Sequence, residues 1–573
     1  MMYAALFLVF SAIDVLCVEA IWRGGFSQAL QWATRIADIC CLTALLTAAL
    51  FGALFMLLGR LAPAACVVNV VLMGFAVVQH YKLELRGEYF VLSDMLLVSE
   101  ALSILEKFTL DFPWYVVLPA ALLALLPVVF WGIRVKGHRR SRAACFVLCA
   151  AVLAGGWPYL IARTDLTTTE LSSYYGHNGL LPGLVWSRPM PPQKPENYTQ
   201  ESVLAALTPY MQEDEAQVKP DILFVMSESL YDLGKIGEFS LSADTMPYTR
   251  ELMNAHWGGE LYVVSYGGGT SLTEYEILTG YRAEKKSVAP YMDPTRVYDG
   301  MSSLATLAGG YGYHCVAMHP SIGETYNRDK VYQRMGFDQS VFIEDMEPVY
   351  DRVGPFPSDK YLFEEIIRQY EARPKDKPWF SFVITFQNHG AYTYDYDKRD
   401  IVVSDRAGAP LKDASTFANA VKTSDESLEA FISYFEKQER PVVIVLFGDH
   451  APALSLIGYD PKDDADTHFT THTTPMMVYS NYGLTMPEEL PRTLPAYRLG
   501  AAVMHALGFR GDAYYNFLAD PAVQGLMEAR GMLLTETGGV MDAAQYDAVN
   551  HRIELLYYDR VYGQQYGKVG EAP

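Results

Sequence analysis

Apolar residues crowd the first third of the 573-residue chain, where long hydrophobic runs are separated by short polar segments. Five runs stand out, at residues 3–18, 39–58, 61–79, 112–133 and 143–161. Each is close to the ~20 residues that an α-helix needs to cross ~30 Å of hydrocarbon. A cleaved signal peptide is the alternative for the first run, but four more runs follow and no basic segment precedes it. The pattern predicts a polytopic membrane domain of five transmembrane helices over residues 1–161.

Positive charge near the membrane indicates how this domain is oriented. The densest basic cluster lies between the last two runs, at Arg134, Lys136, Arg139, Arg140 and Arg142. Basic loops stay in the cytoplasm, and an odd number of spans then places everything after about Arg163 outside the cell. We therefore expect a multi-pass protein of the plasma membrane whose C-terminal part is extracellular.

Two connecting segments lack a clear apolar run. Residues 81–111, on the expected outer face, have helical spacing from Asp94 onward and fit either a simple connector or an interfacial helix lying in the headgroups. Residues 162–217 lose periodicity and gain proline, notably in RPMPPQKPENYTQE, which predicts an extracellular linker. Small residues in VLAALTP, within this linker, also resemble a site that an exported protease would cut.

Beyond the linker, short apolar runs alternate with helical patterns. The runs DILFVM, ELYVVS, YHCVAMH, WFSFVITF, VVIVLF and PMMVYS are typical of buried strands. Helical spacing occurs in TMPYTRELMNAH, SLATLAGG, SDKYLFEEIIRQYEA and ASTFANAVKTSDESLEAFISYFEKQ. The alternation predicts an α/β domain over residues 218–515, with a mainly parallel sheet sandwiched by helices. Residues 516–573, with a helix-like EARGML segment and the apolar IELLYYDRVYG, are expected to form a C-terminal extension packed on it.

Charge and cysteine usage narrow the function classes. The formal net charge of −21 argues against nucleic acid as a partner, because a phosphate backbone demands basic surface, but a phospholipid needs only a local basic site. Only Cys315 of the seven cysteines lies in the expected exported part, so no disulfide can form within it. The outer domain must therefore be held together by its own core.

Polar residues follow two of the predicted strands in an unusual way. DILFVM runs into Ser227-Glu228-Ser229, and VVIVLF runs into Gly448-Asp449-His450. In open α/β sheets, ligands bind beyond the carboxyl ends of the strands. Carboxylate oxygens and an imidazole nitrogen suit Mn²⁺, Mg²⁺ or Zn²⁺, and the absence of cysteine ligands argues against a structural zinc site. Each residue alone would be a cap or a hydrogen-bonded strand end, but their coincidence at one sheet edge favours a metal site.

The stretch GGGTSLTEYEILTG raises the question of whether Thr270 is a helix cap or a nucleophile. Ser271-x-x-Glu274 fits a capping box, and from this stretch alone capping is the better interpretation. Glycines before a helix N-terminus also expose backbone N–H groups that can bind a phosphate. A hydroxyl placed there beside a divalent cation would be an activated nucleophile.

Two further segments contain groups that phosphoryl transfer would need. HPSIGETYNRDKVY contains His319, Tyr326 and Arg328, and an arginine can hold phosphate oxygens in a fork. FQNHGAY places His389 just past a predicted strand, where an imidazole could protonate a leaving alkoxide and later deprotonate an acceptor alcohol. A lone histidine is more often structural, but two histidines and an arginine after strands of one sheet make a stronger case.

Taken together, the motifs resemble those of a known family. SES, GGGTSLTE, HPSIGETYNRD, QNHGAY and FGDHAP, in this order after five apolar runs, are similar to the membrane-anchored phosphoglycerol transferases of the alkaline phosphatase/sulfatase superfamily. The lipoteichoic acid synthases are the best known members of this family. The resemblance covers nearly the whole chain and implies a sulfatase-like fold for the α/β domain.

The resemblance also implies roles for particular residues. One divalent ion, Mn²⁺ or Mg²⁺ in kind, would be bound by Glu228, Thr270, Asp449 and His450. Glycerophosphate would be bound by His319, Tyr326, Arg328 and His389. Thr270 would attack phosphatidylglycerol, release diacylglycerol and pass the glycerophosphate to a polyglycerolphosphate chain, a glycolipid or a glycan, with His389 as the second catalytic residue. Two positions depart from the family pattern, because Gly269 stands where a basic residue is common and Tyr326 where tryptophan is common.

Three other functions are weighed against this one. A sulfatase needs a Cys or Ser nucleophile in a C/S-x-P-x-R setting, and the residues after Thr270 include neither that proline nor that arginine. A phosphoethanolamine transferase also uses a threonine, but its usual support is zinc and several disulfides in the exported domain. A catalytically silent sensor that binds glycerophosphate polymers would have lost a ligand, and all four presumed ligands are present.

Overall fold

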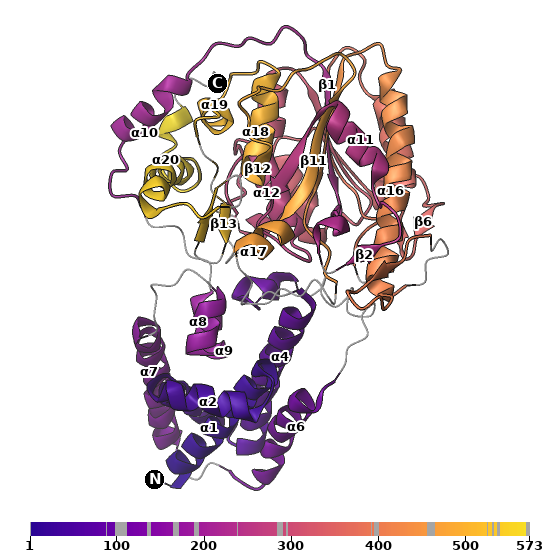
Figure 1. Cartoon of the computed structure of the whole chain (residues 1–573). Helices are drawn as coiled ribbons and strands as arrows, with labels where there is room; N and C mark the ends of the chain where they lie inside the picture. The colour runs from indigo at the N-terminus through magenta and orange to yellow at the C-terminus, as the bar shows by residue number, and fades with distance from the viewer. Residues whose placement is uncertain are drawn as a thin grey trace. The chain divides into compact units, whose positions relative to one another are not determined.

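The chain forms two compact units, Met1–Met95 with Thr109–Pro189, and Leu96–Phe108 with Met190–Pro573 (Figure 1). The computed structural model describes residues 2–86, 89–97, 112–134, 139–163, 171–187, 194–237, 239–283, 290–293, 296–390, 392–394, 400–454, 465–523, 525, 527–529, 532–535 and 539–568. The expected helix from Asp94 onward lies mostly outside these residues. Only its start, the 3₁₀ helix η1 (Leu92–Leu97), is described.

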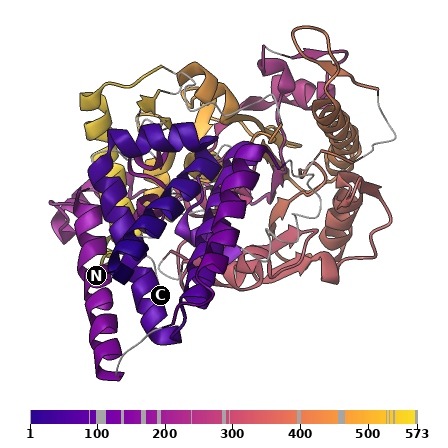
Figure 2. The ribbon, with the colours of Figure 1, turned by 90° about the horizontal axis from the view of Figure 1, so that it is seen from below.

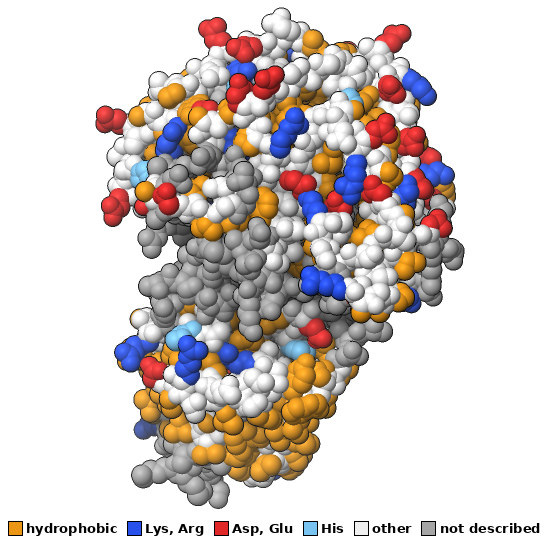
Figure 3. Space-filling view, in the orientation of Figure 1, with side chains coloured by type: hydrophobic (Ala, Val, Ile, Leu, Met, Phe, Trp, Pro, Cys, Tyr) orange, Lys and Arg blue, Asp and Glu red, His pale blue; other side chains and the backbone are white. Residues whose placement is uncertain are grey.

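The first unit is a bundle of apolar helices (Figure 2). The five predicted runs correspond to α1 (Met2–Arg23), α3 (Ala37–Leu58), α4 (Leu61–Arg86), α6 (Trp114–Val129) and α7 (Arg139–Arg163). Among the described residues, three segments are long and apolar enough to cross a membrane, at Ala37–Leu58, Leu61–Glu84 and Arg139–Arg163. α6 is apolar but has 16 residues, and α1 contains Asp14, Glu19 and Arg23. Exposed apolar side chains on this unit include Leu57, Val70, Leu125 and Val129. Figure 3 shows hydrophobic side chains gathered on one face of it.

A proline in α6 removes one hydrogen bond of the helix, and a side chain of α4 replaces it. Pro127, in α6, has no N–H to donate to the carbonyl of Leu123 one turn earlier. The side-chain amide of Asn69, in α4, donates to that carbonyl at 2.7 Å. In an apolar surrounding an unbonded carbonyl costs several kcal/mol, by general estimate, so this contact stabilises the pairing of the two helices.

The two ends of the first unit differ in chemistry. At one end Arg60 and Arg134 form a β-bridge between the two interhelical turns, and the Arg142 guanidinium donates to the Met56 carbonyl at 2.6 Å. At the other end lie α2 (Phe26–Arg35) and two short helices, α8 (Leu171–Asn178) and α9 (Leu180–Trp186). The Glu19 carboxylate accepts from Arg23 at 2.6 Å and from the backbone N–H of Leu180 at 2.7 Å, which holds α9 on α1.

The segment of residues 162–217, expected as a linker without periodicity, contains short helices. Besides α8 and α9, it contains α10 (Gln200–Leu207), whose N-terminus is closed by a capping box between Thr199 and Ser202. VLAALTP lies in α10 and the following 3₁₀ helix η2 (Thr208–Tyr210), with Val203 and Leu207 buried in the core of the second unit. Proline between these helices hid their short periodic segments.

The second unit is built on an eight-stranded sheet with the order β12-β3-β11-β10-β1-β8-β4-β5 (Figure 1). The parallel strands that matter for the site are β10 (Val442–Gly448), β1 (Asp221–Ser227), β8 (Trp379–Ile384), β4 (His314–His319) and β5 (Gln339–Phe342). The antiparallel strand β11 (Thr473–Ser480) joins β10 to β3 (Trp257–Tyr262), which pairs with the short parallel strand β12 (Thr493–Pro495). The mainly parallel sheet is therefore confirmed.

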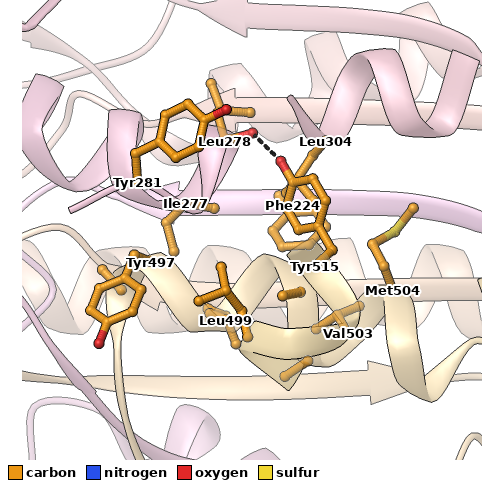
Figure 4. Close-up of a cluster of buried hydrophobic side chains, with 14 of the residues drawn as sticks. Phe224, Ile277, Leu278, Tyr281, Leu304, Tyr497, Leu499, Val503, Met504 and Tyr515 are labelled. Atoms are coloured by element: carbon orange, nitrogen blue, oxygen red, sulfur yellow. Dashed lines mark hydrogen bonds between the residues drawn. The ribbon is translucent and has the colours of Figure 1, made fainter. Parts of the chain in front are cut away.

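Alternate residues of the central strands enter two hydrophobic cores, one on each face of the sheet. Phe224 and Val445 face the core covered by α12 (Thr270–Thr279), α13 (Leu304–Gly310), α18 (Ala496–Ala506) and α19 (Ala513–Ala519). Val225 and Leu446 face the core covered by α11 (Pro247–Ala255), α15 (Asp359–Ala372) and α16 (Lys412–Glu436). Figure 4 shows the first core beneath α12, where the Tyr515 hydroxyl donates to the Leu278 carbonyl at 3.2 Å. This packing fixes the helix that carries Thr270.

The C-terminal segment contains one expected helix and one error. IELLYYDRVYG lies mostly in α20 (Ala543–Val561), which is joined to the N-cap of α19 by an ion pair of Arg560 with Asp512 at 2.7 Å. EARGML is not helical: β13 (Met527–Ala529) and β14 (Met532–Leu534) pair as antiparallel strands.

Candidate active site

Three metal-binding side chains meet where two neighbouring strands end. Glu228 follows β1, and Asp449 and His450 follow β10, its parallel neighbour, with Ser227 opposite Gly448 in the register. One ligand atom from each lies within 4.8 Å of the others, and all three side chains are buried. The structure thus brings together the residues that the sequence placed at one sheet edge.

Ser229 orients both carboxylates of this cluster. Its backbone has a φ of 50°, in the left-handed region that non-glycine residues rarely adopt. In this conformation the Ser229 N–H donates to Asp449 Oδ1 at 2.7 Å, and the hydroxyl donates to Glu228 Oε1 at 3.0 Å. Backbone strain of this kind persists where the surroundings enforce it, which is common at functional sites.

The unsatisfied atoms of the cluster fit a cation. Asp449 Oδ2 is buried without a hydrogen-bond partner, and it lies 3.2 Å from His450 Nε2. Nδ1 of His450 lies 3.0 Å from the Ala451 carbonyl, which can only accept, so Nδ1 holds the proton and Nε2 presents its lone pair. Burial, and next the adjacent Asp449 carboxylate, raise the pKa of Glu228 to about 8. Two buried carboxylates and an imidazole lone pair facing one point would be stabilised by a divalent ion.

Thr270 lies at the edge of the same cluster. Its Oγ1 is 3.5 Å from both Glu228 Oε2 and His450 Nε2, and its side chain is only half buried. Thr270 is the first residue of α12, the N-cap is Gly269, and no side chain caps the helix. The capping-box interpretation of Ser271 and Glu274 is therefore wrong, and the hydroxyl of Thr270 is directed at the metal-binding cluster.

The glycines before Thr270 shape the approach to this hydroxyl. Gly267, Gly268 and Gly269 have φ values of 66°, 142° and 87°, which side chains with a Cβ rarely tolerate. The turn is fastened to the end of β10, because the Gly267 N–H donates to the Ala451 carbonyl at 3.0 Å. Helix N-termini bind anions through their free N–H groups and dipole, so a phosphate could be held next to the Thr270 hydroxyl.

The second predicted group of residues follows β4 and β8. His319 ends β4, and its Nδ1 lies 3.2 Å from the Ile384 carbonyl, so Nε2 presents a lone pair. Burial, and next the Arg328 guanidinium, hold the pKa of His319 well below its usual range. The Arg328 guanidinium lies 5.0 Å from the Tyr326 ring, and Tyr326 has a φ of 59°. His319 is therefore a neutral acceptor beside an arginine and an aromatic ring.

The guanidinium of Arg328 is not free to bind a phosphate through two neighbouring nitrogens, contrary to expectation. Its Nε and Nη2 donate to Glu274 Oε2 at 3.1 and 2.8 Å, and both side chains are buried. The fork that could have gripped a phosphate is thus occupied by a carboxylate from α12.

His389 is positioned by a buried network behind it. Its loop begins at the end of β8, where the Gln387 amide donates to the Ser424 hydroxyl at 2.9 Å and the Asn388 amide donates to the same hydroxyl at 3.1 Å. Ser424 in turn donates to the Asp359 carboxylate. Burial raises the pKa of Asp359 to about 6. The imidazole of His389 packs against Phe386, which also contacts the His319 ring, so both histidines belong to one site.

Sequence reasoning missed three residues of the site. Ser229 was visible only as part of the SES motif, Glu274 was interpreted as a capping residue, and Asp359 was placed in a helix without a further role. Glu274 and Asp359 act through other side chains and do not follow a predicted strand, whereas Ser229 follows β1 directly after Glu228 and acts through Glu228 and Asp449.

Comparisons with known proteins agree with this fold. A family model described as Sulfatase matches residues 220–494. A Rhizobium meliloti protein named "Putative cyclic beta-1,2-glucan modification protein" is 30% identical over 512 residues, covering 83% of this chain and 78% of the relative. The structure of Streptococcus pyogenes phosphoglycerol transferase GacH with sn-glycerol-1-phosphate has a TM-score of 0.55 at 21% identity, covering 65% of this chain and 96% of that one.

A membrane protein shares the fold over a longer stretch. The integral membrane lipooligosaccharide phosphoethanolamine transferase A of Neisseria meningitidis has a TM-score of 0.52 at 14% identity, covering 90% of this chain and 98% of that one. The fold and the three-residue cluster define a sulfatase-like domain, in a chain that also has helices long and apolar enough to cross a membrane. The chain belongs to one family with the Rhizobium meliloti protein, and its residues 220–494 are a sulfatase domain.

Proposed function

We propose that this protein transfers glycerophosphate from phosphatidylglycerol to a glycan outside the cytoplasmic membrane, through a covalent intermediate on Thr270. The position of the Thr270 hydroxyl carries the proposal, at 3.5 Å from two residues of a metal-binding cluster and at the start of a helix. Glycan is favoured among the possible acceptors because the 30%-identical relative is named for glucan modification. A polyglycerolphosphate chain or a glycolipid remains the alternative acceptor.

The proposed metal ligands are Glu228, Asp449, His450 and the hydroxyl of Thr270. Three oxygen donors and one nitrogen, without cysteine, favour Mn²⁺ or Mg²⁺. When bound, the ion would lower the pKa of the Thr270 hydroxyl and offset the charge of the transferred phosphate. Ser229 and the backbone of Ala451 would hold the ligands in place.

The proposed reaction has two displacement steps. In the first, Thr270 Oγ1 loses its proton to water and bonds to phosphorus, while the bond from phosphorus to the diacylglycerol oxygen breaks and protonated His389 gives that oxygen a proton. In the second, His389 takes the proton of an acceptor hydroxyl, whose oxygen bonds to phosphorus as the bond to Thr270 breaks. The Thr270 oxygen then regains a proton from water.

Substrate contacts are assigned to the second group of residues. His319 Nε2 is a neutral acceptor for a glycerol hydroxyl, Tyr326 offers a ring face, and Arg328 keeps one nitrogen outside its contacts with Glu274. The N-terminus of α12 would bind the phosphate oxygens.

The proposed topology has five membrane spans, with the catalytic domain of residues 218–515 and its extension of residues 516–573 on the outer side. The three segments that are long and apolar enough support it. So does the gathering of Arg60, Arg134 and Arg142 at one end of the helical unit, which fits a cytoplasmic face.

Intact-protein mass spectrometry tests the intermediate. The full chain in detergent is incubated with phosphatidylglycerol and Mn²⁺, and we expect a glycerophosphate-sized mass increase that a chelator prevents. Thr270→Ala should show none, whereas the matched control Thr279→Ala, at the far end of the same helix, should behave as wild type. An adduct that persists in Thr270→Ala, or one formed only with phosphatidylethanolamine, would contradict the proposal.

The acceptor is tested separately. Wild-type protein with phosphatidylglycerol is offered a cyclic glucan, a glycerophosphate oligomer or a glycolipid, and transfer is followed by the mass of each acceptor. Modification of the glucan alone is expected. Transfer only to the oligomer or the glycolipid would replace the glycan in the proposal and leave the intermediate intact.

A further inference from the structure

Glu274 connects the helix of the nucleophile to the arginine of the substrate site. It lies in α12, one turn after Thr270, and is 0% exposed. Its carboxylate accepts from Nε and Nη2 of Arg328 at 3.1 and 2.8 Å, and from the Tyr332 hydroxyl. Arg328 and Tyr332 stand one turn apart in α14 (Arg328–Arg334), so a single carboxylate joins two helices of the site.

The proton of Tyr332 stays in place in this arrangement. Burial, and next the Glu274 charge, raise the pKa of Tyr332 well above its ordinary value. The hydroxyl therefore remains a donor, and Glu274 is held by three hydrogen bonds from two side chains. Its position is set by the fold and does not depend on a bound substrate.

The ion pair of Glu274 with Arg328 lowers the positive charge that a bound substrate would meet. Arg328 contributes one positive charge, and Glu274, in direct contact with it, contributes one negative charge. His319 contributes none, because burial and Arg328 keep it neutral. Two carboxylates, Glu228 and Asp449, would likewise offset a divalent ion. The positive charge that remains is then the one that His389 would carry in the first step, and it offsets one negative charge of a substrate but not two.

We propose that Glu274, through its ion pair with Arg328, makes this site select singly charged phosphodiesters over doubly charged phosphomonoesters. The second negative charge of a monoester would lie near the Glu274 carboxylate without a cation to offset it, in a buried site where screening is weak. Phospholipids with an esterified headgroup, such as phosphatidylglycerol, are phosphodiesters, whereas sugar phosphates are phosphomonoesters. Glu274 is thus a specificity-determining residue that acts by positioning Arg328 and offsetting its charge.

The inference rests on phosphotransfer by Thr270, as proposed above, but not on phosphatidylglycerol as the donor. Two substrates with the same leaving group isolate the charge: p-nitrophenyl phosphate and its glycerol diester. Both are offered at pH 8 with Mn²⁺ to the full chain in detergent, since a monoester phosphate with a second pKa of about 6 is then doubly charged. The quantity measured is the ratio of kcat/KM for the diester to kcat/KM for the monoester.

Wild type is expected to favour the diester, and Glu274→Gln should lower the ratio at least tenfold by leaving Arg328 unpaired. Glu274→Asp keeps the charge and should stay near the wild-type ratio. Glu276→Gln is the matched control, because Glu276 is a buried glutamate of the same helix that accepts from the Ala283 N–H and does not touch Arg328. An unchanged ratio in Glu274→Gln, or an equal loss of both activities, would overturn the proposal.

A binding experiment distinguishes this inference from the proposed function. In a Thr270→Ala background, calorimetry with glycerophosphoglycerol and with glycerol phosphate should show a preference for the diester that Glu274→Gln reverses. If no adduct forms from phosphatidylglycerol but this reversal occurs, the donor is wrong and the role of Glu274 stands. If the adduct forms and the preference does not move, the role of Glu274 is wrong.

Discussion

Ser229 shows how much of the site depends on one residue that would never touch substrate. Its N–H and its hydroxyl hold one carboxylate each, Asp449 and Glu228, from two different strands. Groups that orient metal ligands typically change metal affinity by 10–100-fold when removed, as a general magnitude.

Ser229→Ala is therefore expected to weaken Mn²⁺ binding about tenfold, because Glu228 loses the hydrogen bond that directs Oε1. Calorimetric titration of the full chain with Mn²⁺ measures this. Ser381→Ala is the control, since Ser381 is buried in β8 and its hydroxyl has no partner among the described residues. Equal affinities in the two variants would mean that the strained backbone alone sets the carboxylates.

Asp359 gives the protein a dependence of stability on pH. Its pKa is raised from 3.8 to about 6 in the fold, chiefly by burial. A raised pKa means that its contribution to stability is full below pH 3.8 and is lost as the pH rises through about 6.

Asp359→Asn should accordingly gain about 2 kcal/mol of stability relative to wild type between pH 4.5 and pH 7.5. Unfolding temperatures of both proteins in detergent, across that range, measure the difference. A constant difference would place the Asp359 pKa near its ordinary value in the fold.

At the scale of elements, a buried ion pair holds α20 to the N-terminus of α19. Arg560 donates to both carboxylate oxygens of Asp512 at 3.0 and 2.7 Å, and its Nε donates to the Tyr281 hydroxyl. Removing one partner of a buried pair leaves an uncompensated charge, which typically costs 3–5 kcal/mol, as an order of magnitude.

Asp512→Ala should thus destabilise the protein by about 3–5 kcal/mol and lower its unfolding temperature. The double variant Asp512→Ala, Arg560→Met should recover part of that loss, because no charge is left buried. A double variant as unstable as the single one would show that Asp512 acts through the cap that it forms on α19, where it accepts from the Tyr514 N–H, and not through its charge.

The elements also show where sequence reasoning succeeds. The strands that converge on the site, such as β1 and β10, are continuous apolar runs, because parallel strands are buried on both faces. Their polar ends then locate Glu228, Asp449 and His450 correctly. β13, β14 and α10 were missed or wrongly assigned because they are short, and their formation depends on tertiary packing more than on their own periodicity. Glu274 was misinterpreted because its partners Arg328 and Tyr332 are 54 and 58 residues away, and Ser229 was missed because its N–H donates to Asp449, 220 residues away.

At the scale of the whole molecule, the proposed topology can be tested without any substrate. A reporter enzyme that is active only outside the cytoplasm should be active when fused after Arg163 and inactive when fused after Arg134. Activity after Arg134 would contradict five spans, and so would inactivity after Arg163. An odd number of crossings is what would bring the catalytic unit to the same side as the headgroups of the outer leaflet.

The contact between Asn69 and the Leu123 carbonyl bears on how the membrane unit is made. On the proposed topology α6 enters the bilayer with one of its own carbonyls unbonded, because Pro127 cannot serve it. α4 precedes α6 in the chain and so leaves the ribosome first, with the amide of Asn69 already in place. Asn69 is thus already made when the Leu123 carbonyl is inserted. In a circular permutant in which α6 precedes α4, we expect α6 to insert less stably.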